Sequence, residues 1–392
     1  MTTGHPRRGS MSRGAAGPAL LVAWLMVSLA CAPAARAPAA GSAASADAGG
    51  APWDALAAAA RTEGEVAIYG PTGGSYRQAL VGPFEAAYPG IKVSFTGGGP
   101  DLPPRVISER QAGKFIPDVI VLGTTTINDI LKPAGALDPL PPLLVRPDVT
   151  DTSRWFENKL WWADNEQQYN LMFEGSVSQL IAVNTSQVDP NSFTSYWDAL
   201  DPKYRGKIVA SDIRRPGPGG GQSRFVWLTE GLGQPFLEKL FGEMDVTLTE
   251  DRRQLADWLA QGRFALSIFP GTNEIDEAAK QGLPVGYVDV RKLKEGYPVS
   301  AAFGTVAVLN RRPHPNAAQL YLNWLLSPDG QIAWQKATRG NSLRADIPKD
   351  SVDPSTVITP GSPVFFVSLE RYAQFELDPV RKVIGDALEK RR

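Results

Sequence analysis

Short apolar stretches alternate with amphipathic ones over the first third of the chain. Three of them predict strands, at Glu65–Tyr69, Ile91–Phe95 and Asp118–Leu122. Helical periodicity follows each strand, at Tyr76–Tyr88, at Pro103–Ala112 and from a capping-box pattern that begins at Thr126. A glycine-rich turn lies between each strand and its helix. Strand, turn and helix repeated three times predict a parallel sheet in an α/β fold.

The pattern in the second half predicts further strands and helices without an internal repeat. Apolar stretches predict four more strands, at Gln179–Asn184, Phe264–Phe269, Gly286–Val290 and Ala301–Asn310. The clearest helix is Pro315–Leu326, whose apolar residues recur at helical spacing. Beyond Ser351 the chain holds three prolines and then a helical stretch, Val380–Lys390. We expect this tail to pack on the first lobe, and its pattern indicates no function.

The first 31 residues have the pattern of an export signal. Three arginines and no acid precede an apolar run from Ala19 to Ala30. The run is shorter than the roughly 20 residues that a membrane-spanning helix needs. Cys31 follows it directly, which resembles a bacterial lipoprotein signal with an acylated cysteine. Ser28 departs from that signal, and an ordinary cleaved leader is the alternative. Both predict a protein outside the cytoplasmic membrane, at the cell surface or in the periplasm.

Residues 32–51 are almost wholly Ala, Pro, Gly and Ser, and they predict a flexible tether. About 340 residues remain, which is more than one hydrophobic core usually serves. Charge is balanced, with 40 Lys and Arg against 41 Asp and Glu, so no nucleic-acid partner is expected. The chain has one cysteine and two histidines, and His5 belongs to the leader. A His/Cys metal site is therefore excluded, and a Ser-His-Asp triad would need His314.

Several segments resemble bacterial extracellular solute-binding proteins. The resemblance rests on Phe84–Val93, on Gly99–Val119, on the stretch Trp197–Ile208 and on Pro313–Asp346. It indicates the substrate-binding component of an ABC importer, in the branch with ferric-iron, thiamine and phosphonate binders. It covers about residues 60–350 and specifies the fold more strongly than the ligand.

The resemblance implies a type II periplasmic-binding-protein fold, in which two α/β lobes joined by two crossing strands hold a ligand between them. We expect lobe one at 52–178 plus 301–392 and lobe two at 179–300. The crossings are expected near Gly175–Ile181 and Ser300–Val306. An ABC permease is the implied partner, the anchor on Cys31 is the implied membrane contact, and a monomer without cofactor is expected.

Ligand-binding residues are expected in turns beyond the carboxyl ends of the strands. Glycine there permits close backbone approach, hydroxyls donate hydrogen bonds, and Arg214 offers a bidentate clamp for an anion. For each residue a structural role is the alternative: a turn for the glycines, and a surface ion pair for Arg214. The candidates are Thr72, Gly73, Ser75, Gly98, Gly99, Thr124 and Thr125 of lobe one, Arg214, Gly219, Ser223, Pro270, Gly271 and Thr272 of lobe two, and Phe303.

The sign of the ligand charge stays open. A small anion or polar organic acid is favoured slightly over a cationic amine, which Asp101, Asp212 and Glu274 with Trp161 or Trp162 would suit. Ferric binders of this branch carry adjacent tyrosines where this chain has Phe269-Pro270. Because Fe³⁺ needs anionic oxygen ligands, no tight iron site is expected.

Three functions compete. The leading hypothesis is a receptor that closes on a small solute and presents it to a permease, without chemistry. A sensor subunit read by a kinase or chemoreceptor would use the same closed form. An enzyme is the third, but the chain has no His or Cys constellation, and its acids near the expected cleft, Asp101, Asp212 and Glu274, show no pairing.

Overall fold

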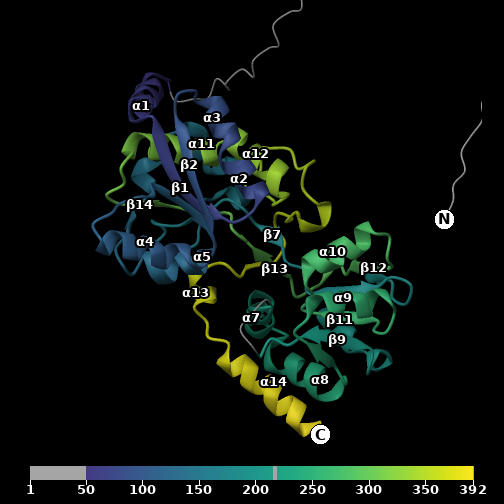
Figure 1. Ribbon diagram of the computed structural model, residues 1–392. Helices are drawn as coiled ribbons and strands as arrows, with labels where there is room; N and C mark the ends of the chain where they lie inside the picture. The colour runs from purple at the N-terminus through teal and green to yellow at the C-terminus, as the bar shows by residue number, and fades with distance from the viewer. Residues whose placement is uncertain (1–49, 215–218, 392) are drawn as a thin grey trace, which may run out of the picture. The chain divides into compact units, whose positions relative to one another are not determined.

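Three β-sheets organise the part of the protein that the structure describes, residues 50–214 and 219–391. The structure is a computed structural model, drawn in Figure 1. The predicted leader, Cys31 and residues 32–49 of the tether lie outside the described residues. Gly50 and Ala51, which we had assigned to the tether, are the first residues of helix α1.

Lobe one is built on a seven-stranded sheet with the order β2-β1-β3-β14-β6-β5, in which β4 pairs with β14. Strands β2, β1 and β3 are parallel, as predicted, and β14 runs antiparallel to β3. The strands are β1 (Glu65–Pro71), β2 (Lys92–Gly98), β3 (Val119–Leu122), β4 (Leu137–Asp138), β5 (Trp161–Trp162), β6 (Leu171–Met172) and β14 (Thr305–Leu309).

Helices cover both faces of this sheet, which explains why β3 is apolar throughout. Val119 and Val121 enter one hydrophobic cluster, and Ile120 and Leu122 enter another on the opposite face. The helices of lobe one are α1 (Gly50–Glu63), α2 (Gly74–Leu80), α3 (Gly82–Ala87), α4 (Leu102–Gln111), α5 (Thr124–Thr126), α6 (Pro147–Thr150), α11 (Pro315–Leu326) and α12 (Pro328–Thr338).

Lobe two is built on a five-stranded sheet with the order β10-β9-β11-β8-β12. Its strands are β8 (Ile181–Asn184), β9 (Ile208–Ser211), β10 (Thr247–Thr249), β11 (Leu266–Ile268) and β12 (Val285–Tyr287). Its helices are α7 (Gly220–Leu228), α8 (Gly233–Glu243), α9 (Arg252–Ala260) and α10 (Thr272–Lys280). Strand β8 is buried on both faces, because Ile181 and Val183 enter a different cluster from Ala182.

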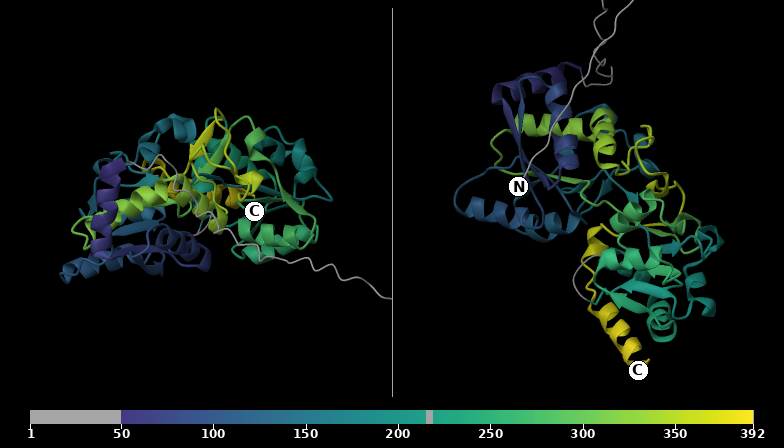
Figure 2. Two further views of the ribbon diagram at one scale, coloured as in Figure 1. Left: turned by 90° about the horizontal axis from the view of Figure 1, so that it is seen from above. Right: turned by 45° about the vertical axis from the view of Figure 1, so that its right-hand side comes forward.

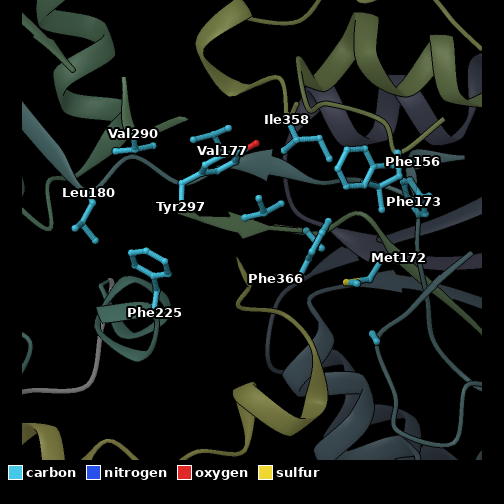
Figure 3. Close-up of a cluster of buried hydrophobic side chains, with 14 of the residues drawn as sticks. Phe156, Met172, Phe173, Val177, Leu180, Phe225, Val290, Tyr297, Ile358 and Phe366 are labelled. Atoms are coloured by element: carbon cyan, nitrogen blue, oxygen red, sulfur yellow. The ribbon is translucent and has the colours of Figure 1, made fainter. Parts of the chain in front are cut away.

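A third sheet, which we call the hinge sheet, joins the lobes. It consists of β7 (Ser176–Val177), β13 (Tyr297–Ser300) and β15 (Val364–Phe366), in the order β15-β13-β7. Strands β7 and β13 pair antiparallel, and the chain crosses between the lobes once in each. Two crossing strands were predicted, and the first lies within the predicted Gly175–Ile181. The second lies earlier than the predicted Ser300–Val306, because residues from Thr305 onward already belong to β14 of lobe one. Figure 3 shows Val177 and Tyr297 from the two strands in one apolar cluster with Phe225 and Phe366.

Two helix predictions were wrong in detail. The helix expected over Tyr76–Tyr88 is divided at Val81, because Pro83 has no N–H to continue α2 and instead lies in the first turn of α3. The helix expected to begin at Thr126 begins at Thr124 and continues as a π-helical turn over Ile127–Leu131. The Thr126 hydroxyl donates to the Gly123 carbonyl oxygen at 2.8 Å and does not cap a helix start.

The C-terminal tail was expected to pack on lobe one, but it contacts both lobes. Helix α13 (Glu370–Ala373) lies against α5 of lobe one, whereas α14 (Asp378–Lys390) packs along α8 of lobe two. Figures 1 and 2 show the yellow final helix beside the teal part of the chain that contains α8. The reason is an apolar stripe of Val380, Ile384 and Ala387, which α8 covers.

Candidate functional site

Three candidate turns of lobe one lie side by side because their strands are parallel and in register. Pro71 at the end of β1 pairs with Gly98 at the end of β2, and Tyr69 pairs with Ile120 of β3. The Thr72 N–H donates to the Gly98 carbonyl oxygen at 2.9 Å. The register therefore brings Thr72, Gly98 and the turn after Leu122 to one edge of the sheet, as predicted from the strand order.

The hydroxyl groups on this edge differ in exposure. Thr72, Ser75 and Thr125 are exposed. Thr124 is buried, and its Oγ1 has no hydrogen-bond partner among the described residues. A buried hydroxyl without a partner is unusual in proteins.

The glycines of these turns have structural roles of their own. A Cβ at Gly98 would lie 2.6 Å from Leu102 Cγ, so side-chain packing alone requires glycine there. Gly73 has a φ of 133°, which L-residues rarely adopt. The Gly99 N–H donates to Asp101 Oδ1 at 2.8 Å. The turn alternative therefore explains these glycines whether or not a ligand binds.

Phe303 lies where the second crossing returns to lobe one. Its ring contacts Tyr76 in a T-shaped arrangement with centroids 5.4 Å apart. A Cβ on Gly123 would lie 4.0 Å from Phe303 Cδ1. Phe303 therefore lies close to residues that follow β1 and β3. The sequence did not single out Tyr76, which lies on helix α2 and reads as an ordinary position of its apolar face.

The lobe-two candidates gather around the carboxyl ends of β9 and β11. Ser211 Oγ donates to the Phe269 carbonyl oxygen at 2.7 Å, which fixes the two strand ends. A Cβ on Gly219 would lie 2.8 Å from Ile213 Cγ2 and 3.7 Å from Phe269 Cβ. Ser223 Oγ donates to the Gly220 carbonyl oxygen at 3.0 Å. These contacts place Gly219 beside the segment that leads into Pro270.

Pro270, Gly271 and Thr272 form the start of α10. Pro270 and Gly271 are buried, and the Thr272 carbonyl oxygen accepts a hydrogen bond from the Tyr287 hydroxyl at 3.0 Å. A Cβ on Gly271 would lie 2.4 Å from Glu274 Oε2, so glycine permits the close approach of this acid. The turn after β11 is therefore tightly packed and contains no tyrosine of its own, and the Tyr287 hydroxyl beside it lies within hydrogen-bond distance of Thr272 and Asp276.

Arg214 forms an ion pair with Asp212 in this structure. Its Nε and Nη2 donate to the two carboxylate oxygens at 2.8 and 2.6 Å. This pairing raises the pKa of Arg214 above its ordinary value. The surface-ion-pair alternative therefore describes the observed contacts, and an anionic ligand would have to compete with Asp212.

Charged residues that the sequence analysis missed lie where the two lobes meet. Arg224 of α7 donates from Nε to the Phe375 carbonyl oxygen at 3.0 Å, and burial lowers its pKa. The charge of Asp129 in lobe one acts on the same guanidinium. Lys132 contacts Glu370 of the tail at 2.6 Å. Lys132 also contacts Glu166 at 2.6 Å. No local sequence pattern marks these residues, because their partners are 34 to 238 positions away.

Glu174 is a buried carboxyl group directly before the first crossing strand. Trp334 Nε1 donates to its Oε2 at 2.9 Å, and Ser176 Oγ donates to its Oε1 at 3.2 Å. Burial raises its pKa to about 8, and the hydrogen bonds offset only part of this effect. Its charge in turn contributes to raising the pKa of Tyr76 to about 12, after burial.

Membrane-spanning and metal-binding features are not found in the described residues. Across residues 50–214 and 219–391, no helix has the length and apolar character needed to cross a bilayer. The same residues contain no cluster of three or more His, Cys, Asp or Glu side chains that could hold a metal ion. His314 hydrogen-bonds to the buried Asp118 at 2.9 Å, at the start of α11.

Residues 69–332 match the family of bacterial extracellular solute-binding proteins, and the chain belongs to this family. Iron-bound HitA from Pseudomonas aeruginosa is a structural relative with 18% identity and a TM-score of 0.52, over 84% of this chain and 98% of HitA. AfuA from Actinobacillus pleuropneumoniae, solved with fructose-6-phosphate, has 18% identity and a TM-score of 0.52, over 83% and 98%. No curated protein matches the chain.

A third relative binds a different class of compound by its name. The spermidine/putrescine-binding protein PotD from Streptococcus pneumoniae has 14% identity and a TM-score of 0.57, over 84% of this chain and 99% of PotD. These likenesses establish the two-lobed type II periplasmic-binding-protein fold. PotD is by its name the substrate-binding protein of an ABC transporter. The chemical variety of the relatives shows that the fold does not fix the ligand.

Proposed function

We propose that this protein captures a small anion or polar organic acid between its two lobes and delivers it to an ABC permease. The observation that carries the proposal is the common edge formed by the turns after β1, β2 and β3. Exposed hydroxyls of Thr72, Ser75 and Thr125 lie on this edge together with the unpartnered Thr124 hydroxyl. Hydroxyl and backbone N–H donors on one edge suit acceptor oxygens of a phosphate or carboxylate.

The lobe-two candidates Arg214, Gly219, Ser223, Pro270, Gly271 and Thr272 would complete the binding site. Ligand contacts to both lobes would favour the closed arrangement over the open one. Lobe one would comprise 52–178 and most of 301–392, and lobe two would comprise 179–300 with α14 against it. We also propose that Cys31 is acylated and holds the mature protein at the outer side of the membrane.

The ligand class is tested with the purified mature protein. Native mass spectrometry identifies any co-purified compound, and thermal-shift assays compare phosphate monoesters and carboxylates with polyamines and with ferric citrate. A ligand at 100 times its Kd stabilises the folded protein by about 2.7 kcal/mol. We expect stabilisation by one of the anions, without formation of a product.

A double variant and a single control variant test where the ligand binds. Thr72→Ala combined with Thr124→Ala removes two hydroxyl donors from the lobe-one edge, so the Kd of the anion is expected to rise about tenfold or more. Thr62→Ala is the matched control, because Thr62 is exposed on α1 and bonds within its own helix. Stabilisation by polyamines alone would support the cationic alternative, and submicromolar binding of ferric citrate would overturn the exclusion of iron.

A further inference from the structure

The C-terminal segment 364–391 contacts both lobes and the hinge sheet. It begins with β15, which pairs in parallel with the crossing strand β13, with Phe366 opposite Val299. The Val367 N–H then donates to the Val299 carbonyl oxygen at 3.0 Å. The segment therefore starts as a third strand beside the crossing that connects the lobes (Figure 1).

The lobe-one end of the segment is fixed by Glu370 of α13. Its side chain is 2% exposed, and its carboxylate accepts from Lys132 Nζ at 2.6 and 2.8 Å. The same carboxylate accepts from the Asn165 N–H at 2.7 Å, and the Glu370 N–H donates to the Ala163 carbonyl oxygen at 2.8 Å. A buried carboxylate with a partly buried cationic partner and a backbone donor is a defined attachment point.

The lobe-two end is fixed by the apolar face of α14. Val380, Ile384 and Ala387 are buried, and a Cβ on Gly242 of α8 would lie 3.7 Å from Ala387 Cβ. Arg391 follows α14, and its Nη1 donates to the Val246 carbonyl oxygen at 3.1 Å and lies 3.4 Å from Asp245 Oδ1.

Only residues 374–377 separate the two attachments. An extended chain of four residues spans at most about 14 Å. Arg224 of lobe two donates to the Phe375 carbonyl oxygen at 3.0 Å, and a Cβ on Gly220 would lie 3.3 Å from Leu377 Cδ1. The short connection thus runs from α13 beside α5, which carries Thr124 and Thr125, to the start of α7.

We propose that residues 364–391 form a strap, a third connection between the lobes that limits how far they separate. The two crossing strands can bend, but lobe one cannot move away from lobe two beyond the reach of residues 374–377 while both attachments hold. The Glu370 attachment is the releasable end, because it depends on the polar contacts of one side chain, whereas α14 is held by a packed apolar face.

The inference shares with the proposed function only the premise that the lobes move relative to each other. The distance between the lobes is measured without ligand, so a failed search for the ligand leaves the strap testable. If the strap test fails, the proposal that the protein binds a small solute still stands.

The test measures the interlobe distance by electron-electron resonance between two spin labels. The full chain carries Cys31→Ser, and labels are attached at Ser108→Cys on α4 and Ala279→Cys on α10, which are exposed positions of lobe one and lobe two. One variant, Glu370→Ala, breaks the lobe-one attachment. A second inserts ten Gly/Ser residues between Gln374 and Phe375, which adds about 17 Å of average reach while both attachments remain.

Both variants are expected to shift the distance distribution towards longer distances. The controls are Asp386→Asn, which removes an exposed ion pair of α14, and the same insertion after Gly282 in an exposed turn. Both controls should keep the distribution of the parent protein. If the insertion at 374 leaves the distribution unchanged in a folded protein, the strap does not limit lobe separation and the proposal is overturned. If Glu370→Ala does not fold, the insertion variant alone tests whether the strap limits lobe separation.

Discussion

At the scale of the residue, Glu174 shows how a fold imposes a property that its local sequence does not contain. Its carboxyl group is buried beside the first crossing and is hydrogen-bonded by Trp334 and Ser176. Gly340 permits this burial, because a Cβ there would lie 2.6 Å from the carboxyl carbon. The sequence around residue 174 predicts a small-residue hinge, and the raised pKa arises from groups that fold over it.

Glu174 should make the stability of the protein depend on pH. Its pKa is about 8 when folded and 4.5 for the ordinary group. Because the folded value is raised, the contribution of Glu174 to stability is fully present below pH 4.5 and is lost as the pH rises to about 8. The loss is on the order of 5 kcal/mol at most.

The Glu174→Gln variant tests this prediction by urea denaturation between pH 5 and pH 8. The variant should lose less stability over this range than the parent protein, since its side chain does not ionise. Exposed Glu243→Gln is the control and should follow the parent. Parallel curves for Glu174→Gln and the parent would show that Glu174 is not the source of the pH dependence.

At the scale of the element, helix α11 was predicted with its observed boundaries, Pro315–Leu326, because its apolar periodicity and its N-terminal proline agree. Helix α2 was predicted too long, because the break depends on Pro83 and on packing at Val81. The parallel direction of β1, β2 and β3 followed from the repeated strand-helix pattern. The start of α5 did not follow from its sequence, since three threonines in a row offer equivalent caps.

The start of α11 is capped by a residue from α1, which the sequence did not reveal. Glu63 Oε2 accepts from the Ala317 N–H at 2.7 Å, and Oε1 accepts from the Asn316 N–H at 3.1 Å. A carboxylate at a helix N-terminus also interacts favourably with the helix dipole. Glu63→Ala should lower the free energy of unfolding by about 1–2 kcal/mol. Exposed Glu65→Ala, on β1, is the control for urea denaturation and should remain near the parent value.

At the scale of the whole molecule, the described residues form one compact unit in which two lobes share a hydrophobic cluster through the hinge. The two crossings followed from the family resemblance and from the small residues around them. The third connection did not, because the contacts of Glu370 and α14 join residues far apart in sequence. The position of the tail was predicted wrongly for this reason.

The proposed membrane anchor of the whole protein depends on one residue, Cys31. If Cys31 is acylated, Cys31→Ser should move the protein from the membrane fraction to the soluble extracytoplasmic fraction, since the anchor supplies the membrane affinity. Cell fractionation with immunoblotting measures this, and Ser28→Ala is the matched control. Equal membrane association of Cys31→Ser and the parent protein would exclude the anchor.

The sequence by itself determined the α/β class, the parallel strands and the edge where the turns of lobe one meet, because these follow from local periodicity and from the geometry of parallel sheets. Its family resemblance indicated the hinge crossings. Tertiary structure alone decided that Lys132 pairs with Glu370, that Glu174 is buried and that the tail connects both lobes. Each of these depends on which distant groups exclude water from a side chain or donate to it, and no local pattern encodes that choice.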